Sequence, residues 1–280
     1  MGDLVLVTGA SSGFGLRTAV ECAAAGFRVV ATMREVGRGA ELARIAGERG
    51  ARLDVEQLDV TSPVVADKVR ELVLKYGPVY ALVNNAGIGV GGVFEEQSDA
   101  DVRDQFETNV FGLMAVTRAV LPAMRAARRG RIVNVSSLSG RIGLPCVSVY
   151  AATKHAVEGF SEALRWETEP FGIQVCVVEP GTFKTDIFGK NQRRGAGVDM
   201  EGPYGVLNRT VERLVAEELE KAPGPEVVGR AIAHLVADPS PPFRTVLGRD
   251  ARTLVALRRF VPDRVFATGV RRVLVRARSR

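Results

Sequence analysis

Cysteine and histidine are scarce in this sequence, and their scarcity excludes two kinds of site. The 280 residues include three cysteines and two histidines. Cys22, Cys146 and Cys176 stand far apart in apolar surroundings, which is typical of small buried side chains in a reducing compartment. His155 and His234 lack the spacing to cysteine or carboxylate residues that metal ligands show, so the sequence predicts no metal site.

Long apolar runs are also missing. The longest uncharged stretch, residues 76–94, is interrupted by a proline, two asparagines and several glycines, so it is not a membrane span. Residues 1–3 lead straight into a short apolar segment without the regions of a signal peptide, and Leu6 stands where myristoylation needs Ser or Thr. With 46% hydrophobic and 25% charged residues, the composition is that of a soluble globular protein, and we expect a cytoplasmic location.

Acidic residues are scarce only near the C-terminal end. The net charge is +6, but residues 249–280 hold ten arginines against two aspartates, which leaves the rest of the chain at −2. This tail has the pattern of two basic amphipathic helices separated at Pro262. We favour packing of the tail on the domain with its arginines in solvent; the alternative is contact with an anionic membrane surface. Because no nucleic-acid motif accompanies the arginines, we expect no nucleic-acid partner.

Short apolar segments alternate with amphipathic ones up to Pro180. Strand character is seen at residues 3–8, 27–32, 52–58, 79–83, 130–135, 172–178 and 244–247. Helical character is seen at residues 16–25, 38–48, 98–128 and 150–169, with a further helix opening after 59–63. This alternation predicts an α/β fold, a doubly wound parallel sheet of about seven strands with helices on both faces.

The alternation breaks after Pro180. The next segment is rich in glycine and charge but carries apolar residues, namely Ile187, Phe188, Val198, Met200, Tyr204 and Leu207, and helices are expected at 206–222 and 225–236. This composition suits a lid over an apolar pocket, at about 186–222, although an ordinary surface loop fits it equally well. We therefore predict a dinucleotide-binding and catalytic domain over 1–250 and a basic helical extension over 251–280.

A glycine-rich turn follows the first expected strand. Glycines allow the backbone to approach a phosphate, and the helix that follows offers free N–H groups and the positive end of its dipole. The spacing Gly9-x-x-x-Gly13-x-Gly15 differs from the G-x-G-x-x-G fingerprint, and a simple helix-capping turn would also account for it. Its place directly after the strand favours a nucleotide site, with Gly9, Ser11, Ser12, Gly13, Phe14 and Gly15 as candidate binding residues.

Two further strand ends carry residues suited to a dinucleotide. After the second strand, Met33 and Arg34 favour the 2′-phosphate of NADP(H), whereas Glu35 leaves NAD(H) as an alternative. After the fourth strand come Asn84, Asn85, Ala86 and Gly87, whose small and amide side chains suit close cofactor contact, although they also suit an ordinary turn.

A candidate reaction centre lies between the fifth strand and the next helix. Ser137 follows the strand, Tyr150 opens the helix, and Lys154 lies one turn further on the same helix face. A neighbouring ammonium favours the phenolate, and a downward pKa shift of about 3 units, roughly 4 kcal/mol, would prepare Tyr150 for acid–base chemistry near neutral pH. Taken alone, the pair is also compatible with a helix whose Tyr and Lys merely share a surface.

Taken together, these motifs resemble the short-chain dehydrogenase/reductase family. The match runs from residue 4 to about 186 and includes Thr8-Gly9-x-x-x-Gly13-x-Gly15, Asp59-Val60, Asn84-Asn85-Ala86-Gly87, Asn109, Ser137, Tyr150-x-x-x-Lys154 and Pro180-Gly181-x-x-x-Thr185. Residues 144–150, 156–165 and 170–173 most resemble the branch that holds retinol and hydroxysteroid dehydrogenases. Phe14 departs from the usual isoleucine, with little effect expected because its backbone N–H would face the pyrophosphate.

The resemblance implies a single-domain Rossmann fold and a role for each matching residue. Tyr150 would be the acid in reduction and the base in oxidation, Lys154 would lower its pKa and bind the nicotinamide ribose, Ser137 would bind the substrate oxygen, and Asn109 would hold a relay water. Asp59 and Val60 would contact adenine, Thr185 the nicotinamide carboxamide, and Pro180, Gly181 and Phe183 would complete the cofactor site. The family also implies a homodimer or homotetramer through the helices that carry Asn109 and Tyr150.

The resulting hypothesis is an NADP(H)-dependent carbonyl reductase or alcohol dehydrogenase that acts on a lipophilic alcohol or ketone. Leu144 and the residues just before Tyr150 are expected to line the substrate pocket. The alternatives are a nucleotide sensor without catalysis and an NAD-dependent alcohol dehydrogenase. An epimerase-like enzyme acting on sugar nucleotides is disfavoured, because such relatives differ in glycine spacing and have a larger C-terminal domain.

Overall fold

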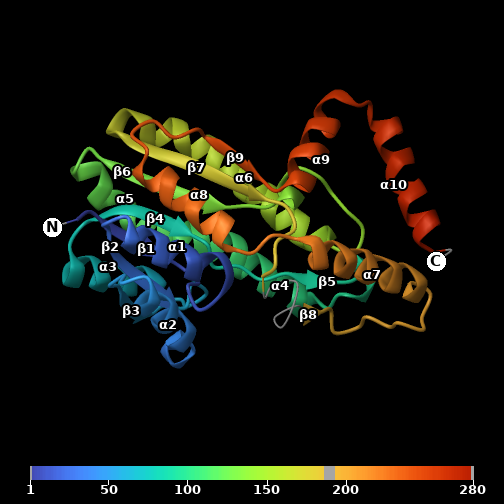
Figure 1. The fold of residues 1–280 in the computed structure, drawn as a ribbon, viewed down its shortest axis with the longest axis horizontal. Helices are drawn as coiled ribbons and strands as arrows, with labels where there is room; N and C mark the ends of the chain where they lie inside the picture. Colours follow the sequence, from blue (N-terminus) through green and yellow to red (C-terminus); the bar gives the residue numbers. More distant parts are fainter. Residues whose placement is uncertain (1, 186–192, 279–280) are drawn as a thin grey trace.

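A seven-stranded parallel sheet forms the centre of the molecule (Figure 1). The computed structural model describes residues 2–185 and 193–278. The strands lie in the order β3–β2–β1–β4–β6–β7–β9, and every neighbouring pair is parallel. They span Asp54–Gln57 (β3), Arg28–Met33 (β2), Leu4–Val7 (β1), Val79–Asn84 (β4), Gly130–Val135 (β6), Ile173–Pro180 (β7) and Arg244–Leu247 (β9). The predicted fold class and number of strands are confirmed.

Helices cover both faces of the sheet, as predicted. The α-helices among the described residues are α1 (Gly13–Ala24), α2 (Ala40–Glu48), α3 (Val65–Tyr76), α4 (Asp99–Phe106), α5 (Leu113–Ala126), α6 (Ser148–Thr168), α7 (Gly205–Lys221), α8 (Glu226–Ala237), α9 (Arg249–Phe260) and α10 (Asp263–Arg278). Short 3₁₀ turns occur at Val36–Gly39, Phe94–Glu96, Leu138–Gly140 and Glu169–Phe171.

The alternation of β1 side chains shows how the two layers are held. Val5 and Val7 pack in the cluster that includes side chains of α1, α2 and α8. Leu4 and Leu6 point to the opposite face, where their cluster includes side chains of α3, α5 and α6. All four are buried, as expected of a strand covered on both faces.

The strand order reverses beside β1, where β2 lies on one side and β4 on the other. In open α/β sheets this arrangement leaves a crevice at the carboxyl ends of the strands. The glycine turn after β1, the loop of residues 85–87 after β4, Ser137 after β6 and Gly181 after β7 therefore lie at one edge of the sheet. The topology thus brings together motifs that are far apart in the sequence.

The long helix predicted over 98–128 is interrupted. It begins with a capping box, in which the side chains of Ser98 and Asp101 each accept a hydrogen bond from the other residue's backbone N–H. It then changes to a π-helical turn over Glu107–Gly112 before α5. The structure also contains a two-stranded parallel pair that the sequence did not predict, β5 (Val90–Gly91) with β8 (Arg193–Arg194).

The C-terminal extension forms two helices, α9 and α10, joined at Pro262 as predicted. In Figure 1 they extend from the body as a hairpin, and the end of the described chain returns to α7. No helix within residues 2–185 and 193–278 is long and apolar enough to cross a membrane.

Candidate active site

The glycine turn after β1 is shaped by contacts with the loop after β4. Gly9 has φ +67°, and a Cβ built on it would lie 2.7 Å from the Cα of Ala86. A Cβ on Gly15 would lie 2.3 Å from the Asn85 amide nitrogen. Gly13 also has a positive φ, +55°, but among the described residues a Cβ there would meet only Thr185, at 3.7 Å. Two of the glycines therefore allow the loops to touch, and the third faces a more open space.

Hydrogen bonds from Asn85 hold the two loops together. Its side-chain amide donates to the carbonyl oxygens of Thr8 and Gly9 at 3.0 and 2.9 Å. The Thr8 hydroxyl in turn accepts from the backbone N–H groups of Asn85 and Ala86 at 3.0 and 3.1 Å. Asn84 is buried and bonds Thr117 and Asn134, so its side chain has a structural role.

The N-terminus of α1 opens beside this turn. Ser12 occupies the N-cap in an extended conformation, and no side-chain capping bond from it is found in the described structure. The first-turn N–H groups are thus left for another acceptor, as at an anion site. The Phe14 side chain packs edge-on against Phe183, with ring centroids 5.6 Å apart, so its backbone rather than its ring faces the turn.

Other candidate cofactor residues lie at neighbouring strand ends. Arg34 is exposed just after β2, and its carbonyl accepts a bond from Gln57 at 3.0 Å. The Asp59 carboxylate accepts from the N–H and hydroxyl of Thr61, and Val60 is buried. Beyond β7, the N–H of Thr182 donates to Asp250 at 2.7 Å, which anchors the loop that contains Gly181 to the start of α9.

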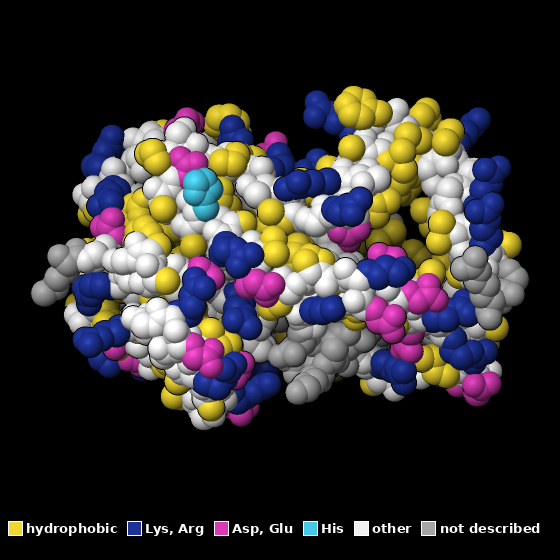
Figure 2. All heavy atoms as spheres, in the orientation of Figure 1, with side chains coloured by type: hydrophobic (Ala, Val, Ile, Leu, Met, Phe, Trp, Pro, Cys, Tyr) yellow, Lys and Arg dark blue, Asp and Glu magenta, His cyan; other side chains and the backbone are white. Residues whose placement is uncertain are grey.

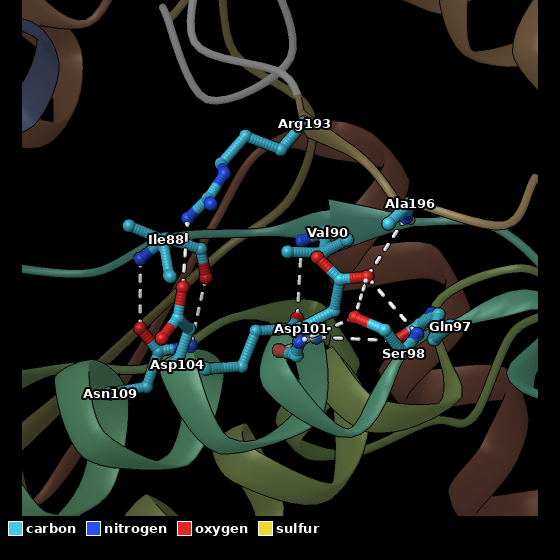
Figure 3. Close-up of polar contacts among 10 residues, drawn as sticks. Ile88, Val90, Gln97, Ser98, Asp101, Asp104, Asn109, Arg193 and Ala196 are labelled. Carbon is cyan, nitrogen blue, oxygen red and sulfur yellow. Dashed lines mark hydrogen bonds and ion pairs between the residues drawn. The ribbon is translucent and has the colours of Figure 1, made fainter.

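Asn109 lies in the π-helical turn and fixes the segment after β4. Its Oδ1 accepts from the N–H of Ile88 at 2.8 Å, and its Nδ2 donates to the Ile88 carbonyl at 2.9 Å. The same Nδ2 donates to Thr153 of α6 at 3.1 Å. Figure 3 shows Asn109 directed at both Ile88 backbone groups. Such π turns are frequent at functional sites, and this one places a single amide between two helices and a loop.

Gly87 allows Asn109 and Lys154 to approach the loop. A Cβ on Gly87 would lie 3.2 Å from Asn109 Oδ1 and 3.7 Å from Lys154 Nζ. The Lys154 side chain is buried, and its Nζ donates to the Val135 carbonyl at 2.9 Å. Burial lowers the pKa of Lys154 to about 8, while the charge of Glu158 acts in the opposite direction.

Tyr150 and Ser137 meet at the end of β6. Burial raises the pKa of Tyr150 to about 12, and a side-chain hydrogen bond with Ser137 acts against that rise. The expected lowering of this pKa by Lys154 is therefore wrong for the structure described here. The physical reason is that desolvation of the phenolate dominates, because Lys154 Nζ bonds Val135 and lies 5.7 Å from the centre of the tyrosine ring.

An apolar pocket opens next to Tyr150. Its lining is Gly89, Val90, Gly91, Gly92, Cys146, Val147, Tyr150, Arg194, Val198, Asn208, Val211, Glu212 and Val215. One wall is α7, and another contains the β5–β8 pair. At 2.7 and 2.9 Å, Arg194 and Glu212 form a two-point ion pair among these lining residues. The site thus combines a buried tyrosine and a half-buried serine with a surface of valines.

The pocket wall around residue 196 is held by Asp101. Its carboxylate accepts from the N–H of Ala196 at 2.9 Å and from Ser98 at the start of α4, as Figure 3 shows. Although burial acts to raise it, these hydrogen bonds hold the pKa of Asp101 below its usual value. The contact joins α4 to the segment that follows β8.

Residues 3–195 match the family model for short chain dehydrogenase. The chain belongs to the short-chain dehydrogenase family. A 3-ketodihydrosphingosine reductase from Bacteroides thetaiotaomicron is 36% identical over 271 residues, which is 96% of this chain and 97% of the relative. Retinol dehydrogenase 8 from Bos taurus is 37% identical over 270 residues, 92% of this chain and 86% of the relative. These relatives agree with the predicted likeness to the retinol dehydrogenase branch.

Solved structures of short-chain dehydrogenases have the same fold. One from Streptomyces avermitilis superposes with a TM-score of 0.80 at 36% identity, covering 96% of this chain and 94% of that chain. A Burkholderia phymatum enzyme in complex with NAD gives 0.80 at 26%, covering 92% and 93%. An actinorhodin polyketide ketoreductase with NADPH gives 0.73 at 31%, covering 88% and 95%. Structures similar to this short-chain dehydrogenase thus carry either nicotinamide cofactor.

Two expectations about the pocket of this short-chain dehydrogenase need correction. Leu144 does not line the pocket; it packs with Leu138, Ile142 and Ala251 instead. Cys146 is not a fully buried core residue but part of the pocket wall, with φ +63°. Burial still raises the pKa of its thiol to about 11.

The lid over about 186–222 stays a prediction. Val198 and α7 line the pocket, whereas Ile187 and Phe188 lie outside the described residues. Pocket residues Val90, Asn208, Val211 and Val215 were missed because single valines and asparagines carry no local signal. The spacing along α7 did carry a signal, because Asn208, Val211 and Val215 recur at helical intervals and so lie on one face of the helix. In residues 2–185 and 193–278, no group of three or more His, Cys, Asp or Glu could hold a metal ion.

Proposed function

We propose that this short-chain dehydrogenase transfers a hydride between NADP(H) and the carbonyl or alcohol group of a lipophilic substrate, with Tyr150 as the acid–base group. One observation carries the proposal: Tyr150, whose pKa the nearby Ser137 acts to lower, forms part of the wall of a valine-lined pocket. Such a pocket suits a largely apolar molecule with a reacting oxygen at one end. The names of two relatives, a retinol dehydrogenase and a 3-ketodihydrosphingosine reductase, support an alcohol or ketone of this kind.

The residues at the carboxyl edge of the sheet fit a dinucleotide. The uncapped N-terminus of α1 offers N–H donors to a pyrophosphate, and the open space at Gly13 allows close approach. The residues that would hold the cofactor are Gly9, Ser11, Ser12, Gly13, Phe14, Gly15, Arg34, Asp59, Val60, Asn85, Ala86, Gly87, Tyr150, Lys154, Pro180, Gly181, Phe183 and Thr185. When bound, the cofactor donates or accepts the hydride, and the protein supplies orientation and the proton.

The preference for NADP(H) rests on Arg34. Its guanidinium is exposed at the end of β2, where a 2′-phosphate would lie in this fold. Guanidinium groups pair with phosphate through two parallel hydrogen bonds, which a ribose hydroxyl does not match. NAD(H) remains the alternative, because Glu35 follows directly.

Tyr150 would move the proton in both directions. With a pKa raised to about 12, its phenol is protonated at neutral pH and can donate to the oxygen of a carbonyl as hydride arrives at carbon. Ser137 would donate a hydrogen bond to the same oxygen and stabilise its developing charge. Lys154 would contribute a positive charge below pH 8, where its ammonium form predominates.

Asn109 would support proton return to Lys154 from the π turn. Both hydrogens of its side-chain amide are already donated, to Ile88 and Thr153. A relay water would therefore be held by the remaining acceptor capacity of Oδ1 or by a backbone carbonyl of the π turn.

The oligomer is proposed to form through the helices that carry Asn109 and Tyr150. Phe111 in the π turn and Trp166 in α6 are 53% and 58% exposed, and both would be covered in a homodimer or homotetramer. Light scattering during gel filtration tests this assembly, and a monomeric mass at micromolar concentration would contradict it.

The reaction is tested with Tyr150→Phe and a panel of ketones and aldehydes graded by size and polarity. We expect NADPH oxidation to fall by about 10² to 10⁴-fold, with NADPH affinity kept, because only the transferable proton is removed. Tyr204→Phe is the matched control, since its hydroxyl bonds Glu95 outside the pocket. Full activity of Tyr150→Phe, or turnover confined to small polar sugars, would contradict the proposal. A wild-type protein that binds NADPH but reduces no carbonyl would indicate the sensor instead.

A further inference from the structure

The hairpin of α9 and α10 is anchored at its base and bare at its apex. Near the base, Ala251 is fully buried and Leu254 packs on the cluster of Leu138 and Ile142, which Phe266 from the first turn of α10 also joins. At the far end of α10, the Arg213 guanidinium of α7 donates to the carbonyl of Ala277. The apex lies between these two anchors and stands clear of the body at the top of the hairpin (Figure 1).

The apex exposes apolar side chains. Phe260 is 78% exposed, Val265 59% and Leu257 44%. All three lie within two turns of Pro262, where the helices join. An aromatic and two aliphatic side chains this exposed near the end of a projecting element bury little apolar surface within the fold itself, which indicates a partner.

Exposed arginines lie beside this apolar apex and along both helices of the hairpin. Exposed arginines on the two helices are Arg249, Arg252, Arg258, Arg259, Arg264, Arg271, Arg272 and Arg276. Asp263, which lies at the apex, is paired with Arg258 at 2.8 Å. Figure 2 shows hydrophobic side chains at the top of the hairpin with Lys and Arg side chains beside them and along the outer side of α10. Because residues 1–248 have a net charge of −2, the positive field is concentrated on the hairpin.

We propose that the apex of the hairpin docks on an anionic phospholipid bilayer. Phe260, Val265 and Leu257 enter the boundary between headgroups and acyl chains, and the flanking arginines pair with lipid phosphates while their stems cover apolar surface. The contact is peripheral, since neither helix could span the bilayer. The hairpin also packs on α7, one wall of the pocket, so docking places the pocket close to the membrane.

Two other partners fit the apex less well. A nucleic acid would pair with the arginines but leave Phe260 and Val265 in water. A second copy of the chain meeting apex to apex would place like charges opposite each other. An anionic bilayer satisfies both the apolar and the basic side chains. The inference does not rest on the proposed reaction, because it concerns a surface outside the catalytic residues.

The test is co-sedimentation of the full-length protein with phosphatidylcholine vesicles, with and without phosphatidylserine. We expect binding to the anionic vesicles, with affinity at least tenfold lower for the neutral ones. Phe260→Ser combined with Val265→Ser should weaken anionic binding at least tenfold. Arg259→Gln combined with Arg264→Gln should weaken it about 25-fold, at about fivefold per arginine. These substitutions are on the surface, and circular dichroism checks that the fold is kept.

Matched controls are available on the same chain. Leu74→Ser removes an apolar side chain that is 87% exposed on α3, and Arg230→Gln removes an exposed arginine of α8. Both should bind anionic vesicles as the wild type does. Equal affinity for neutral and anionic vesicles, or wild-type binding by the apex variants, would overturn the proposal. The proposal would also be overturned if the protein bound no vesicles but bound an oligonucleotide through Arg259 and Arg264. It would likewise be overturned if the protein bound no vesicles but self-associated, and lost that self-association in Phe260→Ser.

Discussion

Tyr150 and Lys154 are both buried, and burial acts on their protonation in opposite directions. It raises the pKa of the phenol to about 12 and lowers that of the ammonium to about 8, since each time the charged form loses hydration. The pair therefore favours its neutral forms within the protein. Such a site keeps a phenol that can donate a proton, at the expense of conformational stability.

Lys154→Met tests this cost. A lysine that titrates near 8 in the folded state and near 10.5 when unfolded destabilises the wild type below pH 8. Stability of the wild type therefore rises between pH 8 and 10, where the unfolded state binds more protons. We expect the Met variant to be inactive and more stable at pH 7 by roughly 1–3 kcal/mol, with a smaller gap at pH 10. Urea unfolding at both pH values measures this, and a gap independent of pH would contradict it.

Arg34→Ala tests the cofactor preference at residue scale. Loss of a charged hydrogen-bond donor to a phosphate should weaken NADPH binding about ten- to a hundredfold and leave NADH binding nearly unchanged. Isothermal titration with both cofactors measures the difference. Arg49→Ala is the control, since its exposed guanidinium pairs with Glu21. Equal losses for the two cofactors would remove the basis for NADP(H).

At the scale of elements, the loops rather than the strands position the functional side chains. Hydrogen bonds between the loops keep those loops in place. The π turn at Glu107–Gly112 lets one amide, that of Asn109, bind Ile88 and Thr153 together. In a regular α-helix each residue advances by about 100° around the axis. With that spacing throughout, the residues of this turn would face other directions and would not leave the same backbone N–H and carbonyl groups accessible. Similarly, Asp250 at the start of α9 anchors the loop after β7.

Asp250→Ala tests this anchor. Without the carboxylate, the N–H of Thr182 loses its acceptor, and α9 loses a favourable charge in its first turn. We expect a loss of about 1 kcal/mol in stability and a rise of several-fold in the KM for cofactor, with a smaller effect on kcat. Asp263→Ala removes the equivalent first-turn aspartate of α10, which pairs with Arg258 instead. An unchanged KM in the first variant, or the same change in both, would argue against a role in the cofactor loop.

At the scale of the whole molecule, the sheet with its two helical layers and the hairpin contribute separately. Within residues 2–185 and 193–278, the core clusters on the two faces of the sheet contain no α10 side chains, whereas α10 contacts α7 and α9. The hairpin therefore supports the pocket wall more than it supports the nucleotide site.

Ending the chain after Pro262 tests this separation. We expect NADPH affinity to change less than about twofold, because α10 packs mainly on α7 and α9, and the KM for an apolar ketone to rise as α7 loses support. Steady-state kinetics with one short and one long ketone measures both effects. Arg213→Ala, which removes one bond to α10, should shift the KM in the same direction but less. A large loss of NADPH affinity would show that the two parts are coupled.

The sheet was predictable because its information is local. A buried parallel strand needs a short run of branched apolar residues, and such runs are visible one at a time in residues 4–7 and 130–135. The glycine spacing and the Tyr150–Lys154 pair were found for the same reason. The π turn was not, because no local pattern distinguishes it from the α-helix on either side.

By itself, the sequence determined the α/β class, the strand order along the chain and the family motifs, since each depends on residues close together in the chain. Tertiary structure alone decided the pocket wall, where Val90, Val147 and Val211 meet from distant segments. It also decided the pKa of Tyr150, because burial by the whole fold outweighs one nearby lysine. Lastly, it left Phe260 bare among arginines, since exposure depends on what else in the molecule packs against a helix.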